Sequence, residues 1–302
     1  MAAATPGRVR GEPIALALGA GGARGLAQIG VIEVLEARGL RIVSVAGSSS
    51  GALVGGIYAA GRLREFREGI ERMTRGEFLR LLDPVIARPG MIGGQRLVGA
   101  MREIVGDPRI EELPVPFTAA AVDMERQRVV WLRSGPLWDA LRASFAISGL
   151  FTPQVVHGRE LVDGGLLAPL PITATRLSDA HRLVAVDMHG RPRQPPGDPA
   201  DGQPAPPPRG SRLGRWLDRR LGNPPSEIGL VDTMSRALDT MQAQIARVQL
   251  ALDPPELVIN IPRDVCQFYE FWRAKEVIGV GREAAEKALD AAGYRAVRPG
   301  EA

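Results

Sequence analysis

The most informative stretch of this chain is Gly47-Ser48-Ser49-Ser50-Gly51, which lies between an apolar run, Ile42 to Ala46, and a small-residue segment, Ala52 to Ala60. This order predicts a strand, a tight turn and a helix. The flanking glycines would let the backbone bend sharply and leave the Ser49 hydroxyl clear of the sheet. Ser49 is therefore a candidate nucleophile, and the start of the next helix would face negative charge on an attacked carbonyl. The alternative is a turn that only joins a strand to a helix.

Alternating strand-like and helix-like segments surround this turn and predict an α/β fold. The expected strands are Ile14–Leu18, Ile42–Ala46, Phe117–Val122, Arg128–Leu132, Leu183–Met188 and Val258–Ile261. The expected helices are Leu26–Arg38, Arg64–Leu82, a long helix from Val231 to Leu252 and two short helices at the end of the chain. Together they indicate a mostly parallel sheet covered by helices.

The long helix carries apolar side chains that alternate three and four residues apart. They are Val231, Met234, Leu238, Met241, Ile245, Val248 and Leu252. This stripe predicts packing against the sheet of the same domain, and a dimer seam is the alternative. The sequence leaves the oligomeric state open.

Length and composition limit the number of domains, the location and the kinds of site that we expect. The 302 residues suit one large domain or two small ones, and 45% hydrophobic content is enough for a full core. No apolar run approaches the roughly 20 residues of a membrane-spanning helix, and Met1–Pro13 lacks signal-peptide features, so we expect a cytoplasmic protein. One cysteine, Cys266, and three histidines make a disulfide framework or a metal site unexpected.

The net charge of +4 is concentrated in one proline-rich segment, Gly190–Pro225. It contains seven arginines against three aspartates, and ten of the chain's 25 prolines, so we expect an insertion or linker. Leucines and Trp216 lie among the arginines of Arg212–Arg220. We expect a solvated tether, and the alternative is a short amphipathic anchor that contacts the inner face of an anionic membrane. No basic face with interleaved aromatic residues is present, so no nucleic-acid partner is expected.

A glycine-rich turn, Gly19-Ala20-Gly21-Gly22-Ala23-Arg24-Gly25, follows the first expected strand. Its amides are little obstructed by side chains and can bind negative charge. A dinucleotide site does not fit, because the glycine fingerprint counted from Gly19 requires glycine at the position of Arg24. We interpret the turn as backbone donors, Gly21 and Gly22 first, aimed at the same point as Ser49. Arg24 would support the loop or bind a lipid phosphate.

Leu161-Val162-Asp163-Gly164-Gly165 places an acid at the end of an expected short strand. The two glycines behind Asp163 allow another backbone or side chain to approach closely. Asp163 is therefore a candidate base for Ser49. The dipeptide alone favours an ordinary Asp-Gly turn.

The three motifs, in this order on one α/β domain, resemble those of the patatin-like phospholipases, above all the short bacterial members. The resemblance runs from about Ile14 to the C-terminus and includes Gly25–Val31, Arg142–Pro153 and Leu166–Pro171. It implies a three-layer fold and a serine–aspartate dyad without histidine, metal or other cofactor. The implied roles are Ser49 as nucleophile, Asp163 as general base, and the amides of Gly21, Gly22 and Ala23 as oxyanion donors. The supporting motif residues are Ala20, Arg24, Gly25, Gly47, Gly51, Gly164 and Gly165.

The resemblance implies hydrolysis of acyl-lipid or phospholipid esters through an acyl-enzyme. Ser49 would attack the ester carbonyl, the protonated Asp163 would return its proton to the leaving alcohol, and water would release the fatty acid. A carboxylate of ordinary pKa is a weak base for serine, so burial of Asp163 is expected to raise that pKa. The expected organisation is a tail (1–13), a catalytic domain (14–189), the insertion (190–225) and a C-terminal part (226–302) that completes the same domain.

Some features depart from the family pattern or fit other functions. Ala20, Gln28 and Ala168 stand where relatives have glycine, histidine and asparagine, and none of these changes removes the dyad. An α/β-hydrolase triad would combine Asp163 with His181 or His189, although both histidines more simply flank a strand. A weakly active regulatory or binding relative would keep the same motifs.

Overall fold

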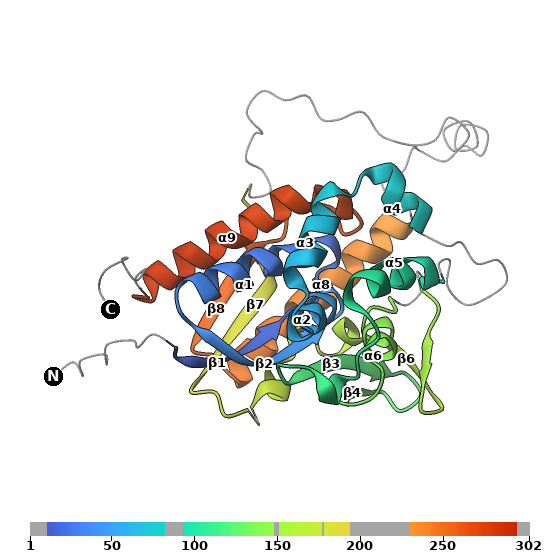
Figure 1. Ribbon diagram of the computed structural model, residues 1–302, viewed down its shortest axis with the longest axis horizontal. Helices are drawn as coiled ribbons and strands as arrows, with labels where there is room; N and C mark the ends of the chain where they lie inside the picture. Colours follow the sequence, from blue (N-terminus) through green and yellow to red (C-terminus); the bar gives the residue numbers. More distant parts are fainter. Residues whose placement is uncertain (1–10, 82–92, 148–150, 177, 194–229, 295–302) are drawn as a thin grey trace.

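A single mixed sheet forms the centre of the computed structural model, which describes residues 11–81, 93–147, 151–176, 178–193 and 230–294 (Figure 1). Its strands are β1 (Pro13–Leu18), β2 (Arg41–Ser48), β3 (Phe117–Asp123), β4 (Arg128–Leu132), β5 (Gln154–Val156), β6 (Arg159–Asp163), β7 (Arg182–Gly190) and β8 (Leu257–Pro262). They follow the order β5-β6-β3-β2-β1-β7-β8, with β4 paired to β3. Strands β8, β7, β1, β2 and β3 are parallel, whereas β4, β5 and β6 join antiparallel. The predicted α/β class is confirmed.

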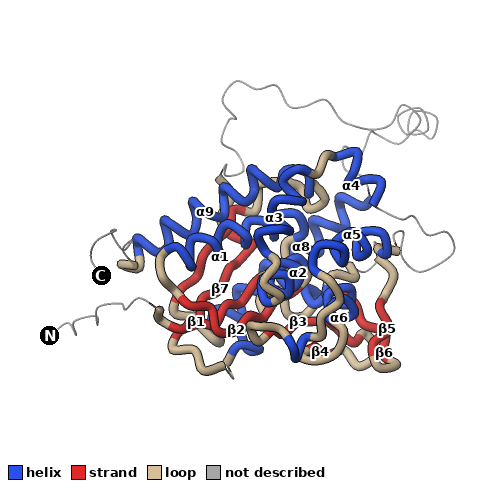
Figure 2. The backbone as a smooth tube through the Cα atoms, in the orientation of Figure 1, coloured by secondary structure: helices blue, strands red, loops and turns tan. Residues whose placement is uncertain are grey.

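Helices cover this sheet on both faces (Figures 1 and 2). They are α1 (Ala27–Ala37), α2 (Ser50–Ala59), α3 (Leu63–Arg72), α4 (Arg75–Leu81), α5 (Gln95–Val105), α6 (Leu137–Ser144), α8 (Leu230–Leu252) and α9 (Ala274–Ala291). Short 3-10 turns are η1 (Gly22–Leu26), η2 (Ile110–Glu112), η3 (Gly164–Leu166), η4 (Ile172–Thr175) and η5 (Phe271–Arg273). Within the described ranges no helix is long and apolar enough to cross a membrane.

Two helix predictions need correction. The expected helix Arg64–Leu82 is broken into α3 and α4, because Thr74 and Glu77 form a capping box that starts a new helix. The two short helices expected at the C-terminus are instead the single turn η5 and the 18-residue helix α9.

The two faces of the sheet carry side chains of different size. Along β1, Ile14, Leu16 and Leu18 point into the large core with α1, α2 and α9, while Ala15 and Ala17 point into a smaller core with α8. This follows from the alternation of side chains along a strand. Helix α9 lies beside α1 on the first face, and α8 covers the second. The result is a three-layer arrangement.

The predicted packing of the α8 stripe on the sheet is wrong for most of its described residues, since only Leu238 and Ile245 are half-buried. Met234, Met241, Val248 and Leu252 are exposed, and the helix buries Gln242, Ala243 and Ala246 instead. The sheet face beneath α8 is lined largely by alanines, so the helix approaches closely with its small residues and turns the large ones outward.

The segment Arg212–Arg220 and most of the insertion 190–225 lie outside the described residues, as does most of the tail 1–13. For Arg212–Arg220, the expected solvated tether and the alternative membrane contact therefore both stay predictions.

The orientation of α8 is testable by matched substitutions on its two faces. Met241 is 56% exposed and Ala246 is 1% exposed. We expect Met241→Gln to change the free energy of unfolding by less than about 0.5 kcal/mol, and Ala246→Gln to lower it by about 1–3 kcal/mol through overpacking. Urea unfolding followed by circular dichroism measures both. The reverse order of losses would place the stripe against the sheet.

Candidate active site

Ser49 lies in a strained turn between β2 and α2. Its backbone has φ 55° and ψ −123°, a conformation that costs a non-glycine residue of the order of 1–3 kcal/mol. The flanking glycines do not take the positive φ. They provide space: a Cβ at Gly47 would lie 2.4 Å from the Gly51 carbonyl oxygen, and a Cβ at Gly51 would lie 2.3 Å from the Leu18 carbonyl oxygen. The bend thus falls on the serine, as expected for a nucleophile elbow.

The register of β3 brings Asp163 to this serine. Ser48, the last residue of β2, pairs with Ala120, and Asp163, the last residue of β6, pairs with Ala121. Strand β4 occupies the other edge of β3 along both positions, so β2 and β6 share one edge and their ends meet there. Gly164 permits this approach, since a Cβ there would lie 2.3 Å from the Ala120 carbonyl oxygen.

Ser49 and Asp163 form a direct hydrogen bond inside the protein. Ser49 Oγ donates to Asp163 Oδ2 at 2.6 Å, and the Gly165 amide donates to Asp163 Oδ1 at 2.6 Å. Burial raises the pKa of Asp163 to about 7, although the hydrogen bonds from Ser49 and Gly165 act to lower it. The carboxyl is therefore a much stronger base than an exposed aspartate. The Ser49 amide donates to Ser144 Oγ at 3.0 Å, a contact that the sequence did not indicate.

The three predicted oxyanion amides have different environments. The Gly21 amide donates to Ser50 Oγ at 3.1 Å, and the Ala23 amide donates to the Phe268 carbonyl at 2.8 Å. Within the described residues the Gly22 amide has no hydrogen-bond partner, and Gly22 lines the same cavity as Ser49. Gly22 is thus the most accessible donor of the three, and its φ of 56° suits glycine.

The other residues of the glycine turn support its shape. Gln28 is buried, and its Nε2 donates to the carbonyls of Gly19 and Gly25 at 3.1 and 3.2 Å. A Cβ at Gly25 would lie 2.1 Å from Ser50 Oγ, so this position requires glycine. Ala20 is not among the described non-glycine residues with positive φ, so its side chain is accommodated.

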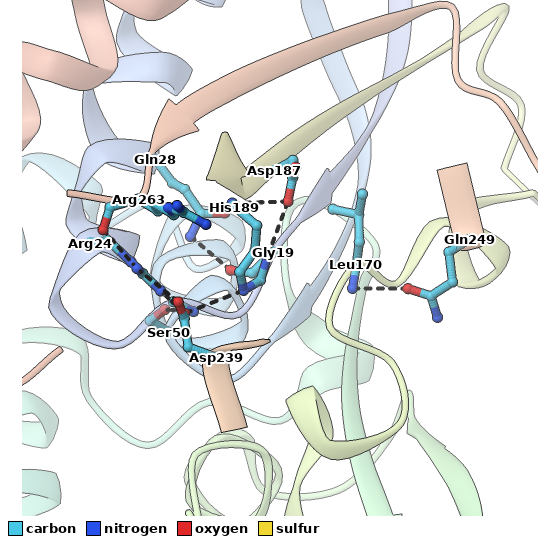
Figure 3. A network of polar contacts seen from close by, with 11 residues as sticks. Gly19, Arg24, Gln28, Ser50, Leu170, Asp187, His189, Asp239, Gln249 and Arg263 are labelled. Carbon is cyan, nitrogen blue, oxygen red and sulfur yellow. Dashed lines mark hydrogen bonds and ion pairs between the residues drawn. The ribbon is translucent and has the colours of Figure 1, made fainter. Parts of the chain in front are cut away.

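Arg24 supports the turn rather than facing the cavity. The side chain is buried and forms an ion pair with Asp239 of α8, as Figure 3 shows. Of the two roles considered for Arg24, the structure therefore favours loop support over binding of a lipid phosphate.

Among the described residues, neither His181 nor His189 forms a hydrogen bond or ion pair with Ser49 or Asp163. His181 is exposed beside the start of β7, and its amide donates to the Pro13 carbonyl. His189 follows in the same strand, and its Nδ1 lies 3.1 Å from Asp187 Oδ1. Ser49 contacts the carboxylate directly, without an imidazole between them. In the described part of the chain no three His, Cys, Asp or Glu side chains are grouped to hold a metal.

An apolar cavity of about 480 Å³ opens beside Ser49. Helices α3, α4 and α5 and the segment around Phe268–Trp272 form most of its wall. Its lining includes Leu53, Phe66, Ile70, Met101, Phe145 and Phe271. Such an apolar wall is suited to a hydrocarbon ligand and lies directly beside the Ser49 hydroxyl.

Sequence comparison places this site in a family. The profile of the patatin-like phospholipase family matches residues 16–176, more than half of the chain, including both Ser49 and Asp163. The chain belongs to the patatin-like phospholipase family. The resemblance inferred from the three motifs is thereby confirmed.

Individual members of this patatin-like family differ in length. This chain is 39% identical to an uncharacterized NTE family protein of Mycobacterium tuberculosis, over 94% of each chain. It is 30% identical to a lysophospholipase nte1 of Emericella nidulans, over 84% of this chain but 16% of that protein. Among solved structures, VipD from Legionella pneumophila aligns with a TM-score of 0.43 and 12% identity, over 94% of this chain and 67% of that one.

The raised pKa of Asp163 makes folding stability depend on pH. The folded state holds the Asp163 proton up to a pKa of about 7, against 3.8 as the ordinary value, so raising the pH between these values destabilises the folded state. Asp163→Asn has no such proton. We expect the stability of the wild type to fall by about 2–3 kcal/mol relative to this variant between pH 5 and pH 8. Urea unfolding at both pH values tests this, and a pH-independent difference would contradict it.

Proposed function

We propose that this protein is a serine lipid acyl hydrolase, a carboxylic ester hydrolase of phospholipase A or lysophospholipase type, that uses Ser49 and Asp163 as its dyad. The observation that carries the proposal is the 2.6 Å hydrogen bond between Ser49 Oγ and the buried Asp163 carboxylate at the wall of an apolar cavity. Family membership and the lysophospholipase name of the Emericella nidulans relative support a lipid substrate.

The proposed reaction forms and then hydrolyses an acyl-enzyme. Ser49 Oγ attacks the ester carbonyl while its proton passes to Asp163, and negative charge collects on the carbonyl oxygen beside the Gly22 amide. The C–O bond to the alcohol then breaks, and Asp163 gives its proton to the leaving oxygen. Water repeats the sequence and releases the fatty acid. A pKa of about 7 suits this role, because the carboxylate is present at neutral pH and is basic enough to accept a proton.

The cavity supports a substrate with one acyl chain in the protein. Its volume of about 480 Å³ is that of a site for one small ligand, and its wall is almost entirely apolar. A polar head group would stay outside, on the alcohol side of the ester. A lysophospholipid or another single-chain ester fits this arrangement better than a lipid with two buried chains.

The first test is chemical labelling of the nucleophile. We expect a fluorophosphonate probe to label Ser49, as located by mass spectrometry. Burial raises the pKa of the Cys266 thiol to about 12, so the thiolate does not compete. Ser49→Ala and Asp163→Asn are each expected to lower hydrolysis of a short acyl ester by about 1,000-fold or more. His181→Ala, a change at an exposed site, is the matched control.

Two outcomes would contradict this assignment. A folded protein that neither reacts with the probe nor hydrolyses esters would favour the regulatory or binding alternative. A folded histidine variant that loses activity as fully as Ser49→Ala would favour a triad.

A second test addresses the acyl cavity. Gly69 on α3 lines the cavity, and a Cβ there would lie 3.4 Å from Ile104 Cδ1. We expect Gly69→Leu to lower kcat/KM for a long-chain ester by about tenfold or more while sparing a short-chain ester, because the added side chain fills space needed by the acyl tail. Gly99→Leu makes the same change at an exposed helix position. Equal losses for both chain lengths would contradict the assignment of this cavity.

A further inference from the structure

A polar network joins the glycine turn to α8, the helix on the face of the sheet opposite α1 and α9 (Figure 3). Arg24 is 6% exposed, and its Nη2 donates to Asp239 Oδ1. Its Nη1 donates to the Arg263 carbonyl at 2.9 Å and to Asp239 Oδ2 at 3.5 Å. The guanidinium is therefore fixed between the carboxylate of one element and the backbone of another.

The main chain of Arg24 fixes a peptide plane in the same turn. Its amide donates to the Gly21 carbonyl at 3.2 Å. The Gly21 carbonyl and the Gly22 N–H belong to one planar trans peptide and point in opposite directions. Holding the carbonyl therefore sets the direction of the Gly22 N–H, which is the accessible donor beside Ser49.

We propose that Asp239 is a positioning residue of the active site, which holds the Gly21–Gly22 peptide in its donating orientation through Arg24. The inference rests on the proposed function. It makes α8 part of the catalytic apparatus, although none of the described side chains of this helix lines the cavity.

The position of Asp239 is itself constrained. His189 Nε2 lies 3.6 Å from Asp239 Oδ1, and Asp187 holds the other side of the imidazole. Without the Asp239 charge, the buried guanidinium would keep the Arg263 carbonyl but lose its carboxylate. An uncompensated buried charge is costly, so Arg24 would move toward water and release the Gly21 carbonyl.

The test compares two aspartates of the same region, each paired with an arginine. Asp239→Asn removes the charge beside the turn, and Asp253→Asn removes the partner of Arg176 just after the end of α8. We expect Asp239→Asn to lower kcat for a short soluble ester by about 10- to 100-fold with KM within twofold, because only the charge that develops during reaction is affected. Asp253→Asn is expected to keep kcat within twofold. Asp239→Glu, which keeps the carboxylate, should recover part of the loss.

A second readout reports the oxyanion without turnover. Ser49 Oγ adds to the carbonyl carbon of an acyl trifluoromethyl ketone, its proton passes to Asp163, and the carbonyl oxygen becomes an oxyanion. We expect Asp239→Asn to weaken this adduct by the same factor as kcat/KM, while the affinity for a free fatty acid, which has no tetrahedral centre, stays unchanged.

Several outcomes would overturn the inference. One such outcome is a kcat of Asp239→Asn equal to that of Asp253→Asn. Another is a loss of affinity for the trifluoromethyl ketone in Asp239→Asn that is no larger than its loss of affinity for the fatty acid. If Asp239→Asn does not fold, Arg24→Lys provides the test, because lysine keeps the charge but cannot bridge Asp239 and the Arg263 carbonyl; unchanged kcat would then overturn the inference. A wild type without ester hydrolysis or Ser49 labelling would instead overturn the proposed function.

Discussion

The structure depends on one buried hydrogen bond, from Ser49 Oγ to Asp163. Burying a carboxylate with only two hydrogen bonds is unfavourable, and its raised pKa is the direct result. The surrounding chain meets the geometric demands of this contact: the ends of β2 and β6 meet on one edge of β3, and glycines stand wherever a Cβ would block the approach. The same cost that weakens the fold at high pH makes Asp163 a useful base at neutral pH.

Small side chains also determine how closely α8 packs on the sheet. One face of the sheet carries the small side chains of Ala15, Ala17 and Ala185. Helix α8 can therefore pack close to this face, with Ala246 against it. This approach brings Asp239 to Arg24, and Arg24 in turn holds the peptide that precedes the Gly22 amide. The packing of a helix on an alanine-lined face and the orientation of a single amide are thus connected.

Several features could be predicted because they depend on local chemistry. Strands and helices followed from apolar periodicity, and Ser49 and Asp163 followed from motifs with glycine at required positions. Other features could not. The apolar stripe from Met234 to Leu252 predicts a buried seam. Most of it is exposed instead, because the small side chains of the sheet face favour packing through Ala243 and Ala246. The glycine-rich motif predicts that the Ala23 amide is a free donor. In the structure this amide donates a hydrogen bond to the carbonyl of Phe268, which is far away in the sequence.

Residue types and short spacings were enough to predict the α/β class, the three motifs, and Ser49 and Asp163 as the proposed nucleophile and base. Three features depend on tertiary contacts: the hydrogen bond between Ser49 and Asp163, the pairing of Arg24 with Asp239, and the position of Gly22 at the wall of the cavity. These depend on strand register and on the distance at which α8 packs. Both are set by contacts between residues far apart in the sequence, such as the strand pairs Ser48–Ala120 and Ala121–Asp163, which no local pattern encodes.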